Sequence, residues 1–179
     1  MSEVLKIAIT GPESTGKSIL AEQLANHYHT VWVPEFARSY IDKLDKPYVA
    51  QDILTIAKGQ LYYEQQLLKK ANHVLFCDTE LIVTKIWSEV KYGYCDPWIL
   101  ENIDQNRYYL FLLCDIDLPW IDDPQREHPH LREKLYDLYF QELTKRKFPF
   151  RIVSGIGDLR LENAIRSIVE FNDLTLVKS

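Results

Sequence analysis

Short hydrophobic runs alternate along the chain with longer stretches in which hydrophobic residues recur every third or fourth position. The short runs are nearly continuous in apolar residues, as is typical of strands buried on both faces of a sheet. We expect strands over 6–10, 31–34, 73–78, 108–114 and 150–153. The helical spacing predicts helices from the loop after residue 10 to about 29, over 51–70, from about 80, and from about 159 to 171.

This alternation predicts an α/β fold in which right-handed crossovers build a parallel sheet with helices on both faces. The chain has 179 residues and shows no repeat, low-complexity segment or linker. We therefore expect a single domain over 1–179. One long irregular stretch, from Asp117 to about His130, interrupts the pattern, and loops of that length usually serve a function or are disordered. The last few residues are expected to fray.

Charge and cysteine content narrow the function classes. The net charge is −5 with a pI near 5.5, which gives no overall basic surface for nucleic acid or an anionic membrane. No apolar run reaches the ~18 residues that span a bilayer, and no signal-peptide profile opens the chain. The cysteines Cys77, Cys95 and Cys114 form no C-x-x-C pair, so we expect a reduced, cytoplasmic protein without a zinc knuckle.

Residues 11–18 read G-P-E-S-T-G-K-S directly after the first expected strand and before a helix. This matches the phosphate-loop pattern G-x-x-x-x-G-K-[ST], whose backbone N–H groups surround nucleotide phosphates at a helix N-terminus. Lys17 would reach the β- and γ-phosphates, and the Ser18 hydroxyl would bind Mg²⁺. The expected nucleotide contacts are Gly11, Glu13, Ser14, Thr15, Gly16, Lys17, Ser18 and Ile19.

Asp78 ends the third expected strand, where an acid can hold a magnesium-bound water opposite the phosphate loop. The alternative is a plain N-cap for the following helix. Because Thr79 could provide that cap alone, we favour the metal role for Asp78.

The fate of the phosphate follows from the rest of the chain. A GTPase would carry a base-reading N-K-x-D stretch, which is absent, and the chain shows no machinery of an energy-coupling ATPase. A small-molecule kinase needs instead an acceptor pocket, a base and a lid. Glu35 follows the second expected strand and could orient an acceptor hydroxyl and accept its proton. Arg38 would share its helical face; the alternative is a simple Glu35–Arg38 ion pair.

Residues 119–132 are the candidate lid, set approximately at 117–132 with the flanking turn. Its arginines, Arg126 and Arg132, could hold the leaving phosphates while the lid excludes water. The alternative is a solvated charged loop in which the arginines have no such part.

Aromatic residues are the candidate contacts for a planar or cationic acceptor. Ordinary core packing is the alternative for each of them. The candidate acceptor contacts are Tyr40, Trp87, Trp98 and Trp120, besides Glu35 and Arg38.

The loop after the fifth expected strand contains Gly155 and Gly157. There Arg160 could stack on the adenine; a plain strand-to-helix turn is the alternative.

Several stretches together resemble the ribosylnicotinamide kinase domain of the NadR type. They are G-P-E-S-T-G-K-S, V-P-E-F-A-R-S-Y, L-F-C-D-T-E-L, T-K-I-W-S-E-V-K-Y-G, P-W-I-D-D-P-Q-R-E and V-S-G-I-G-D-L-R, in chain order. The resemblance implies ATP- and Mg²⁺-dependent phosphorylation of the 5′-hydroxyl of nicotinamide riboside. It also implies a three-layer P-loop fold with a five-stranded parallel sheet in the order 2-3-1-4-5.

By this resemblance the catalytic set is Lys17, Glu35, Asp78 and Arg126. Bifunctional members of the family carry an N-terminal adenylyltransferase domain, which the residues before Ile7 are too few to form, so a free-standing kinase domain is expected. Two other functions stay open. One is a kinase for another nucleoside or a nucleotide, and the other is a regulatory nucleotide- or lipid-binding module without catalysis.

Overall fold

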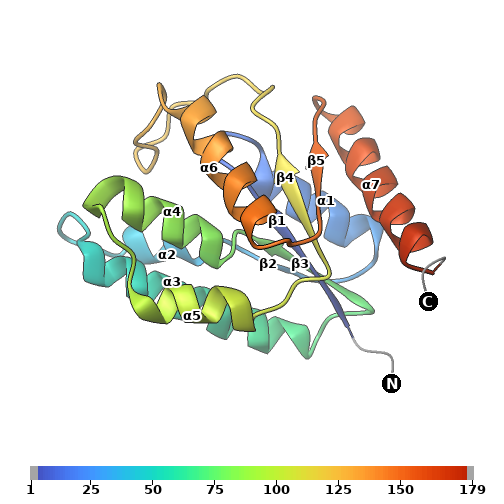
Figure 1. Cartoon of the computed structure of the whole chain (residues 1–179), viewed down its shortest axis with the longest axis horizontal. Coiled ribbons are helices and arrows are strands. Elements are labelled where there is room, and N and C mark those ends of the chain that lie inside the picture. The colour runs from blue at the N-terminus through green and yellow to red at the C-terminus, as the bar shows by residue number, and fades with distance from the viewer. Residues whose placement is uncertain (1–3, 177–179) are drawn as a thin grey trace.

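The computed structural model describes residues 4–176 and is built around a five-stranded parallel sheet with the strand order β2-β3-β1-β4-β5 (Figure 1). The parallel sheet and its order are therefore confirmed. The strands are β1 (Leu5–Thr10), β2 (Trp32–Val33), β3 (Val74–Asp78), β4 (Leu110–Cys114) and β5 (Phe150–Val153).

Helices cover both faces of the sheet, as Figure 1 shows. On one face lie α1 and α7, and on the other lie α3, α4, α5 and α6, with the short α2 packed beside α3. The helices are α1 (Lys17–His27), α2 (Phe36–Ile41), α3 (Ala50–Leu68), α4 (Leu81–Tyr92), α5 (Pro97–Gln105), α6 (Arg132–Lys145) and α7 (Asp158–Leu176).

The alternation of side chains along β1 divides the core into two clusters. Ile7 and Ile9 pack with α1 and α7, whereas Ala8 between them faces the cluster formed with α3 to α6. All three side chains are at most 1% exposed. Burial on both faces explains why these strands read as continuous apolar runs rather than as alternating ones.

The strands end close to where the hydrophobic pattern predicts. The second strand is shorter than the expected 31–34, because Pro34 has no N–H to continue a ladder. The first helix ends at His27 rather than near residue 29, where His29 adopts a left-handed φ of 51°. The long helix over 51–70 is observed at Ala50–Leu68. The expectation for the last few residues falls largely on 177–179, outside the described chain.

The start of α4 corrects one expectation. Thr79 is not the N-cap, because its backbone turns into the left-handed region with a φ of 68°. The N-cap is Glu80, which is buried and accepts hydrogen bonds from Ile82 N at 2.6 Å and from Thr10 Oγ1 at 2.9 Å. Asp78 is therefore still not needed as a cap.

The pattern had not placed α5 and α6, and it placed α2 only as a possible turn after Glu35. Between Cys114 and Arg132 the chain forms no helix or strand, as expected for the candidate lid. Among the described residues, no helix is both long and apolar enough to cross a membrane.

Gly59 sets the distance between α2 and α3, because a Cβ built on it would lie 2.2 Å from Cε1 of Phe36. Gly→Ala inside a helix normally stabilises by about 1 kcal/mol. We predict the reverse for Gly59→Ala: a loss of about 1–3 kcal/mol from the overlap with the Phe36 ring. Urea unfolding measures this change in the free energy of unfolding, and Thr55→Ala at an exposed position of the same helix is the control. A stabilised Gly59→Ala protein would contradict the close packing of α2 on α3.

Candidate active site

The phosphate loop joins β1 to α1 at the carboxyl end of the central strand. Gly11 and Gly16 have φ values of 131° and 74°, which side chains rarely tolerate. A Cβ on Gly11 would lie 3.0 Å from the Cys114 carbonyl oxygen, and one on Gly16 would lie 2.9 Å from Cδ1 of Leu118. Both glycines are thus required by the close approach of β4 and the lid base.

Lys17 lies across the loop, where its Nζ donates to the Pro12 carbonyl at 2.7 Å. Thr15 Oγ1 donates to the same carbonyl at 2.8 Å. These two contacts fold the loop around its concave side and keep the ammonium group of Lys17 at the cavity.

A cavity of about 200 Å³ opens beside this loop. Pockets for small molecules usually measure roughly 300–1,000 Å³, so this cavity is small for a nucleotide and a second molecule together. The cavity is lined by Gly11, Pro12, Glu13, Ser14, Thr15, Gly16, Lys17, Ser18, Ile19, Glu35, Ala37, Arg38, Ile41, Tyr48, Val83, Ile86, Trp87, Val90, Gln125, Arg126, Glu127, His128, Leu135 and Tyr139.

Asp78 lies at the end of β3, only 1% exposed, and neither of its carboxylate oxygens has a hydrogen-bond partner of good geometry. Burial and then the charge of Glu35 raise its pKa to about 6, whereas the nearby Ser18 hydroxyl and the Lys17 charge act to lower it. A buried carboxylate without a partner is costly. Its surroundings therefore fit a cation, and a hard oxygen donor beside a serine hydroxyl and phosphates suits Mg²⁺.

Within residues 4–176, no group of three or more His, Cys, Asp or Glu side chains converges on a possible metal site. A cation here would take its protein ligands from Ser18 and Asp78. Nucleotide phosphate oxygens and water would complete the shell, as is usual for Mg²⁺.

Glu35 and Arg38 come from the start of α2. Glu35 is the N-cap residue of that helix, but its side chain makes no capping bond, and it lines the cavity. Arg38 does not form the simple ion pair with Glu35: its Nη1 donates to Asp123 Oδ2 of the lid at 2.9 Å. The two residues therefore lie between the phosphate loop and the lid.

Part of the cavity lining is apolar and aromatic. Trp87 Nε1 donates to the Tyr48 hydroxyl at 2.9 Å, and the two rings meet edge to face with centroids 4.9 Å apart. Tyr48 and Tyr139 were missed by sequence reasoning. Tyr48 follows an irregular turn that carries no motif, and Tyr139 belongs to the unplaced α6. The spacing of Val83, Ile86 and Val90 on α4 is the helical signal that could have identified this wall.

Three predicted acceptor contacts do not line the cavity. Tyr40 donates to Asp52 Oδ1 at 2.7 Å, between α2 and α3. Trp98 lies on α5 with the Lys58 ammonium 5.2 Å from its ring. Trp120 is on the lid, where its Nε1 donates to Asp122 Oδ1 at 2.8 Å. The structure thus brings Trp87 to the cavity and leaves these three outside it.

The candidate lid, residues 117–132, lies against the phosphate loop. Glu13 accepts from the backbone N–H groups of Glu127 and His128 at 3.2 and 3.1 Å. The Ser14 hydroxyl accepts from Ile121 N at 2.9 Å. Arg126 donates to the Ile121 carbonyl and lines the cavity, so its guanidinium lies over the phosphate loop.

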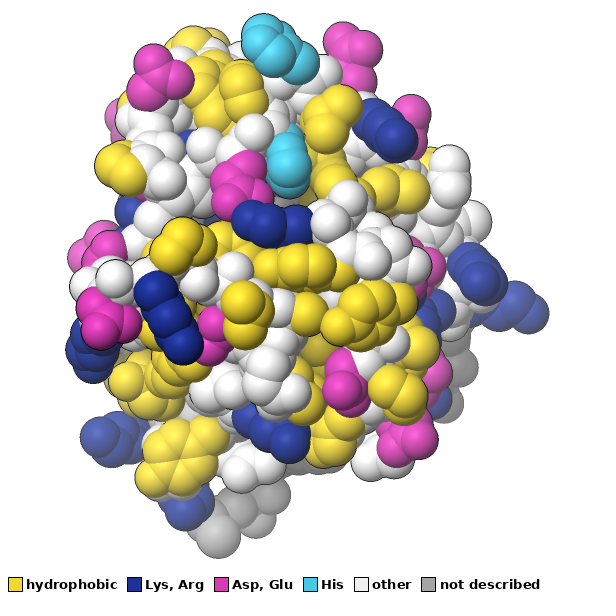
Figure 2. Space-filling model, turned by 90° about the vertical axis from the view of Figure 1, so that its left-hand side faces the viewer, with side chains coloured by type: hydrophobic (Ala, Val, Ile, Leu, Met, Phe, Trp, Pro, Cys, Tyr) yellow, Lys and Arg dark blue, Asp and Glu magenta, His cyan; other side chains and the backbone are white. Residues whose placement is uncertain are grey.

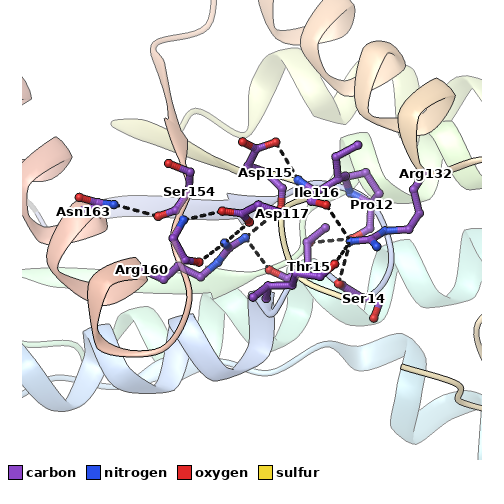
Figure 3. A network of polar contacts seen from close by, with 12 residues as sticks. Pro12, Ser14, Thr15, Asp115, Ile116, Asp117, Arg132, Ser154, Arg160 and Asn163 are labelled. Atoms are coloured by element: carbon purple, nitrogen blue, oxygen red, sulfur yellow. Dashed lines mark hydrogen bonds and ion pairs between the residues drawn. The ribbon is translucent and has the colours of Figure 1, made fainter. Parts of the chain in front are cut away.

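Arg132 and Arg160 hold the backbone around the phosphate loop from opposite sides, as Figure 3 shows. Arg132 Nη2 donates to the Leu118, Ser14 and Ile116 carbonyls at 2.8, 3.2 and 3.4 Å. It therefore ties the lid base to the loop and does not line the cavity.

The position of Arg160 corrects the expectation that it stacks on adenine. It is 4% exposed, and its Nη1 binds Asp117 Oδ1 at 2.6 Å and the Gly155 carbonyl at 2.8 Å. Its Nη2 donates to the carbonyls of Thr15 and Asp115 at 2.8 and 3.0 Å. The buried guanidinium thus braces the phosphate loop from behind and does not line the cavity.

The face on the side of α2 and α4 shows the mixed character of this region (Figure 2). Hydrophobic side chains gather across its middle, and acidic, basic and histidine side chains lie above them. A ligand entering from this side would meet both charged and apolar surface.

The family model described as an AAA domain matches residues 6–160. The chain belongs to this family. A curated relative, the trifunctional NAD biosynthesis/regulator protein NadR of Escherichia coli (strain K12), is 33% identical over 129 residues. That match covers 69% of this chain but only 31% of the relative, so the chain spans about a third of its length. The resemblance to the NadR type is confirmed.

Solved structures support the fold of this AAA-domain chain. A NadR protein in complex with NR superposes with a TM-score of 0.73 at 22% identity, covering 94% of this chain and 52% of that one. Thymidylate kinase from Ehrlichia chaffeensis gives a TM-score of 0.66 at 13% identity, covering 94% and 99%. At these identities the likeness shows the three-layer P-loop fold.

The buried Asp78 carboxylate leads to a prediction about the stability of the protein. Because the pKa of Asp78 is raised in the folded state, that state binds the proton more tightly, and stability falls as pH rises from about 4 to above 6. Asp78→Asn should therefore stabilise the metal-free protein at pH 8 by up to about 3 kcal/mol, with the gain vanishing near pH 4.

Urea unfolding in EDTA at both pH values checks this, with Asp137→Asn at an exposed position of α6 as the matched control. A less stable Asp78→Asn protein at pH 8 would show that the carboxylate is satisfied by protein groups.

Proposed function

We propose that the protein is an ATP-dependent kinase that phosphorylates the 5′-hydroxyl of nicotinamide riboside, giving nicotinamide mononucleotide for NAD salvage. The observation that carries the proposal is the pairing of the buried, unpartnered Asp78 with Glu35 beside a phosphate loop under a lid. A module that only bound nucleotide would not need a second carboxylate at the cavity.

The residues divide between donor and acceptor. The backbone N–H groups of 13–18 and the Lys17 ammonium bind the ATP phosphates. Arg126 on the lid compensates the negative charge that spreads over the transferring phosphoryl group. The lid excludes water from the γ-phosphate, which favours transfer over hydrolysis.

Ser18 and Asp78 would hold Mg²⁺ with the phosphates. When bound, the ion neutralises charge on the β- and γ-phosphate oxygens. Glu35 then orients the acceptor hydroxyl and accepts its proton as the oxygen attacks phosphorus.

The acceptor side suits a flat, cationic ring. Trp87 supplies aromatic surface and Glu35 supplies negative charge on the same cavity. The Tyr48 ring and the Glu127 carboxylate beside them already bind the Lys91 ammonium. A positively charged pyridinium is attracted both to the faces of aromatic rings and to carboxylates. The NR-bound NadR structure supports this choice of nucleoside by analogy of fold.

We place the reaction in the cytoplasm. Cys77, Cys95 and Cys114 are free thiols, as expected in a reducing compartment, and ATP is the proposed donor.

A panel of nucleosides and mononucleotides, incubated with ATP and Mg²⁺ and followed by mass detection of products, tests the acceptor. We expect nicotinamide riboside to give the highest kcat/KM. Preference for another nucleoside or for a monophosphate would replace the acceptor while keeping the reaction. Absence of any phosphorylated product, with ATP still bound, would favour a regulatory module.

Changing Glu35 to Gln tests the base. Glutamine keeps the size but cannot accept the proton, so kcat should fall by roughly 10²-fold or more while ATP affinity stays within about twofold. Single-turnover kinetics and ATP titration measure the two quantities. Glu22→Gln, at an exposed position of α1 that does not line the cavity, is the control. An unchanged rate of phosphoryl transfer in the Glu35 variant would show that another residue accepts the proton.

A further inference from the structure

Glu127 of the lid is held at both of its ends. Its backbone N–H donates to Oε1 of Glu13 at 3.2 Å. Its side chain accepts from the Tyr48 hydroxyl at 2.9 Å and from Lys91 Nζ at 2.8 and 3.1 Å. One lid residue therefore contacts two different walls of the cavity.

Those walls belong to the two halves of the site. Glu13 is part of the phosphate loop, where the nucleotide is expected. Tyr48 belongs to the aromatic wall at the acceptor end, where it also accepts from Trp87 Nε1 at 2.9 Å. Lys91 lies at the end of α4 with its ammonium 3.8 Å from the centroid of the Tyr48 ring. Tyr48 is thus bound to the acceptor wall and to the lid at once.

The Glu127 contacts differ from an isolated surface ion pair. An exposed pair contributes little, because two long side chains must be ordered for one interaction. Here Lys91 and Tyr48 bind the same carboxylate, and the Tyr48 ring also lies against Lys91 and Trp87. Ordering the Tyr48 side chain serves several contacts at once. The contacts among Glu127, Lys91 and Tyr48 can therefore change together when a ligand ring binds against Tyr48 and Trp87.

We propose that Glu127 is a positioning residue that couples occupancy of the acceptor wall to closure of the lid over the phosphate loop, so that ATP is transferred rather than hydrolysed. This rests on the proposed function, since it requires an acceptor seated against Tyr48 and Trp87. The contacts of Glu127 with Tyr48, Lys91 and Glu13 belong to the closed position of the lid. An acceptor ring that holds Tyr48 in place would favour this closed position over an open one.

The competing reaction defines the readout. A water oxygen forms the bond to the γ-phosphorus while the bond to the β–γ bridging oxygen breaks, giving ADP and inorganic phosphate. In transfer, the acceptor oxygen forms that bond instead, and each ADP is matched by one phosphorylated nucleoside. The ratio of ADP to phosphorylated nucleoside therefore reports whether closure excludes water.

The experiment compares wild type with Glu127→Ala and Glu127→Gln, with Glu133→Gln on the exposed side of α6 as a matched control. ADP and phosphorylated nucleoside are measured in the same reactions. We expect the ratio to stay near one for wild type and Glu133→Gln. For Glu127→Ala, the excess ADP formed per phosphorylated nucleoside should rise by roughly threefold or more above the wild-type excess, the scale of one or two lost polar contacts. Glu127→Gln should lie between them, because an amide oxygen still accepts a hydrogen bond.

Lys91→Met provides a second route to the same contact. As a single substitution, Lys91→Met should raise the ratio of ADP to phosphorylated nucleoside. Combined with Glu127→Ala it should add little, since the two residues act through one contact. Additive effects would overturn the coupling.

A readout independent of the acceptor keeps the two proposals separable. Hydrogen exchange at the amides of 119–131, with AMP-PNP and Mg²⁺, should be several-fold faster in Glu127→Ala than in wild type. Adding the nucleoside acceptor should slow this exchange in wild type but not in Glu127→Ala, which a role confined to holding the lid would not predict. If wild type makes no nicotinamide mononucleotide, the proposed function fails, and the ratio is read with whichever nucleoside it does phosphorylate. If Glu127→Ala matches wild type in exchange, or in the ADP ratio on a phosphorylated nucleoside, the inference about Glu127 is overturned.

Discussion

The buried carboxylate of Asp78 imposes the condition around which the site is arranged. It lies at the end of β3 with neither oxygen hydrogen-bonded, next to the central strand that carries the phosphate loop. Desolvation and the nearby Glu35 charge both work against its ionised form. Under the proposed function, a bound cation would remove this cost, and the position would give up stability for function.

The strand order brings the other parts to this carboxylate. Because β1 lies between β3 and β4, the phosphate loop has Asp78 on one side and the base of the lid on the other. Ligands of open parallel sheets bind at the carboxyl ends of the strands for this reason. Arg132 and Arg160 hold the phosphate loop and the segment after β4 together by donating to main-chain carbonyls. These acceptors remain when a side chain of the loop is replaced.

Sequence reasoning worked where the signal is local. The hydrophobic runs located the strands, and the phosphate loop was identified from its motif between an expected strand and an expected helix. Glu35 and Asp78 came to the cavity region because strand ends in a parallel sheet share one edge. Arg126 came there on the irregular segment that follows β4. Reasoning failed where a side chain has two chemically sensible partners. Arg160 could have faced a base, but burial gave it four carbonyl or carboxylate partners.

Other misses have similar causes. Glu80 caps α4 because the left-handed turn at Thr79 shifts the helix start by one residue, which no pattern encodes. Trp98 and Tyr40 are aromatic like Trp87, and composition cannot tell which aromatic faces a cavity. Tyr48 came from an irregular turn, and its place depends on contacts to α4 and the lid that are distant in sequence.

The folded-down lid has a consequence for the rate at which ligands bind. A cavity of about 200 Å³ is small for the two substrates of the proposed kinase. Under the proposed function, entry would wait for the contacts from Glu13, Ser14 and Arg38 to the candidate lid to separate. Association should then be gated by a first-order opening step, so the observed binding rate levels off at high ATP concentration instead of rising in proportion. The apparent affinity is lowered by the fraction of molecules that are closed, and product release passes through the same opening.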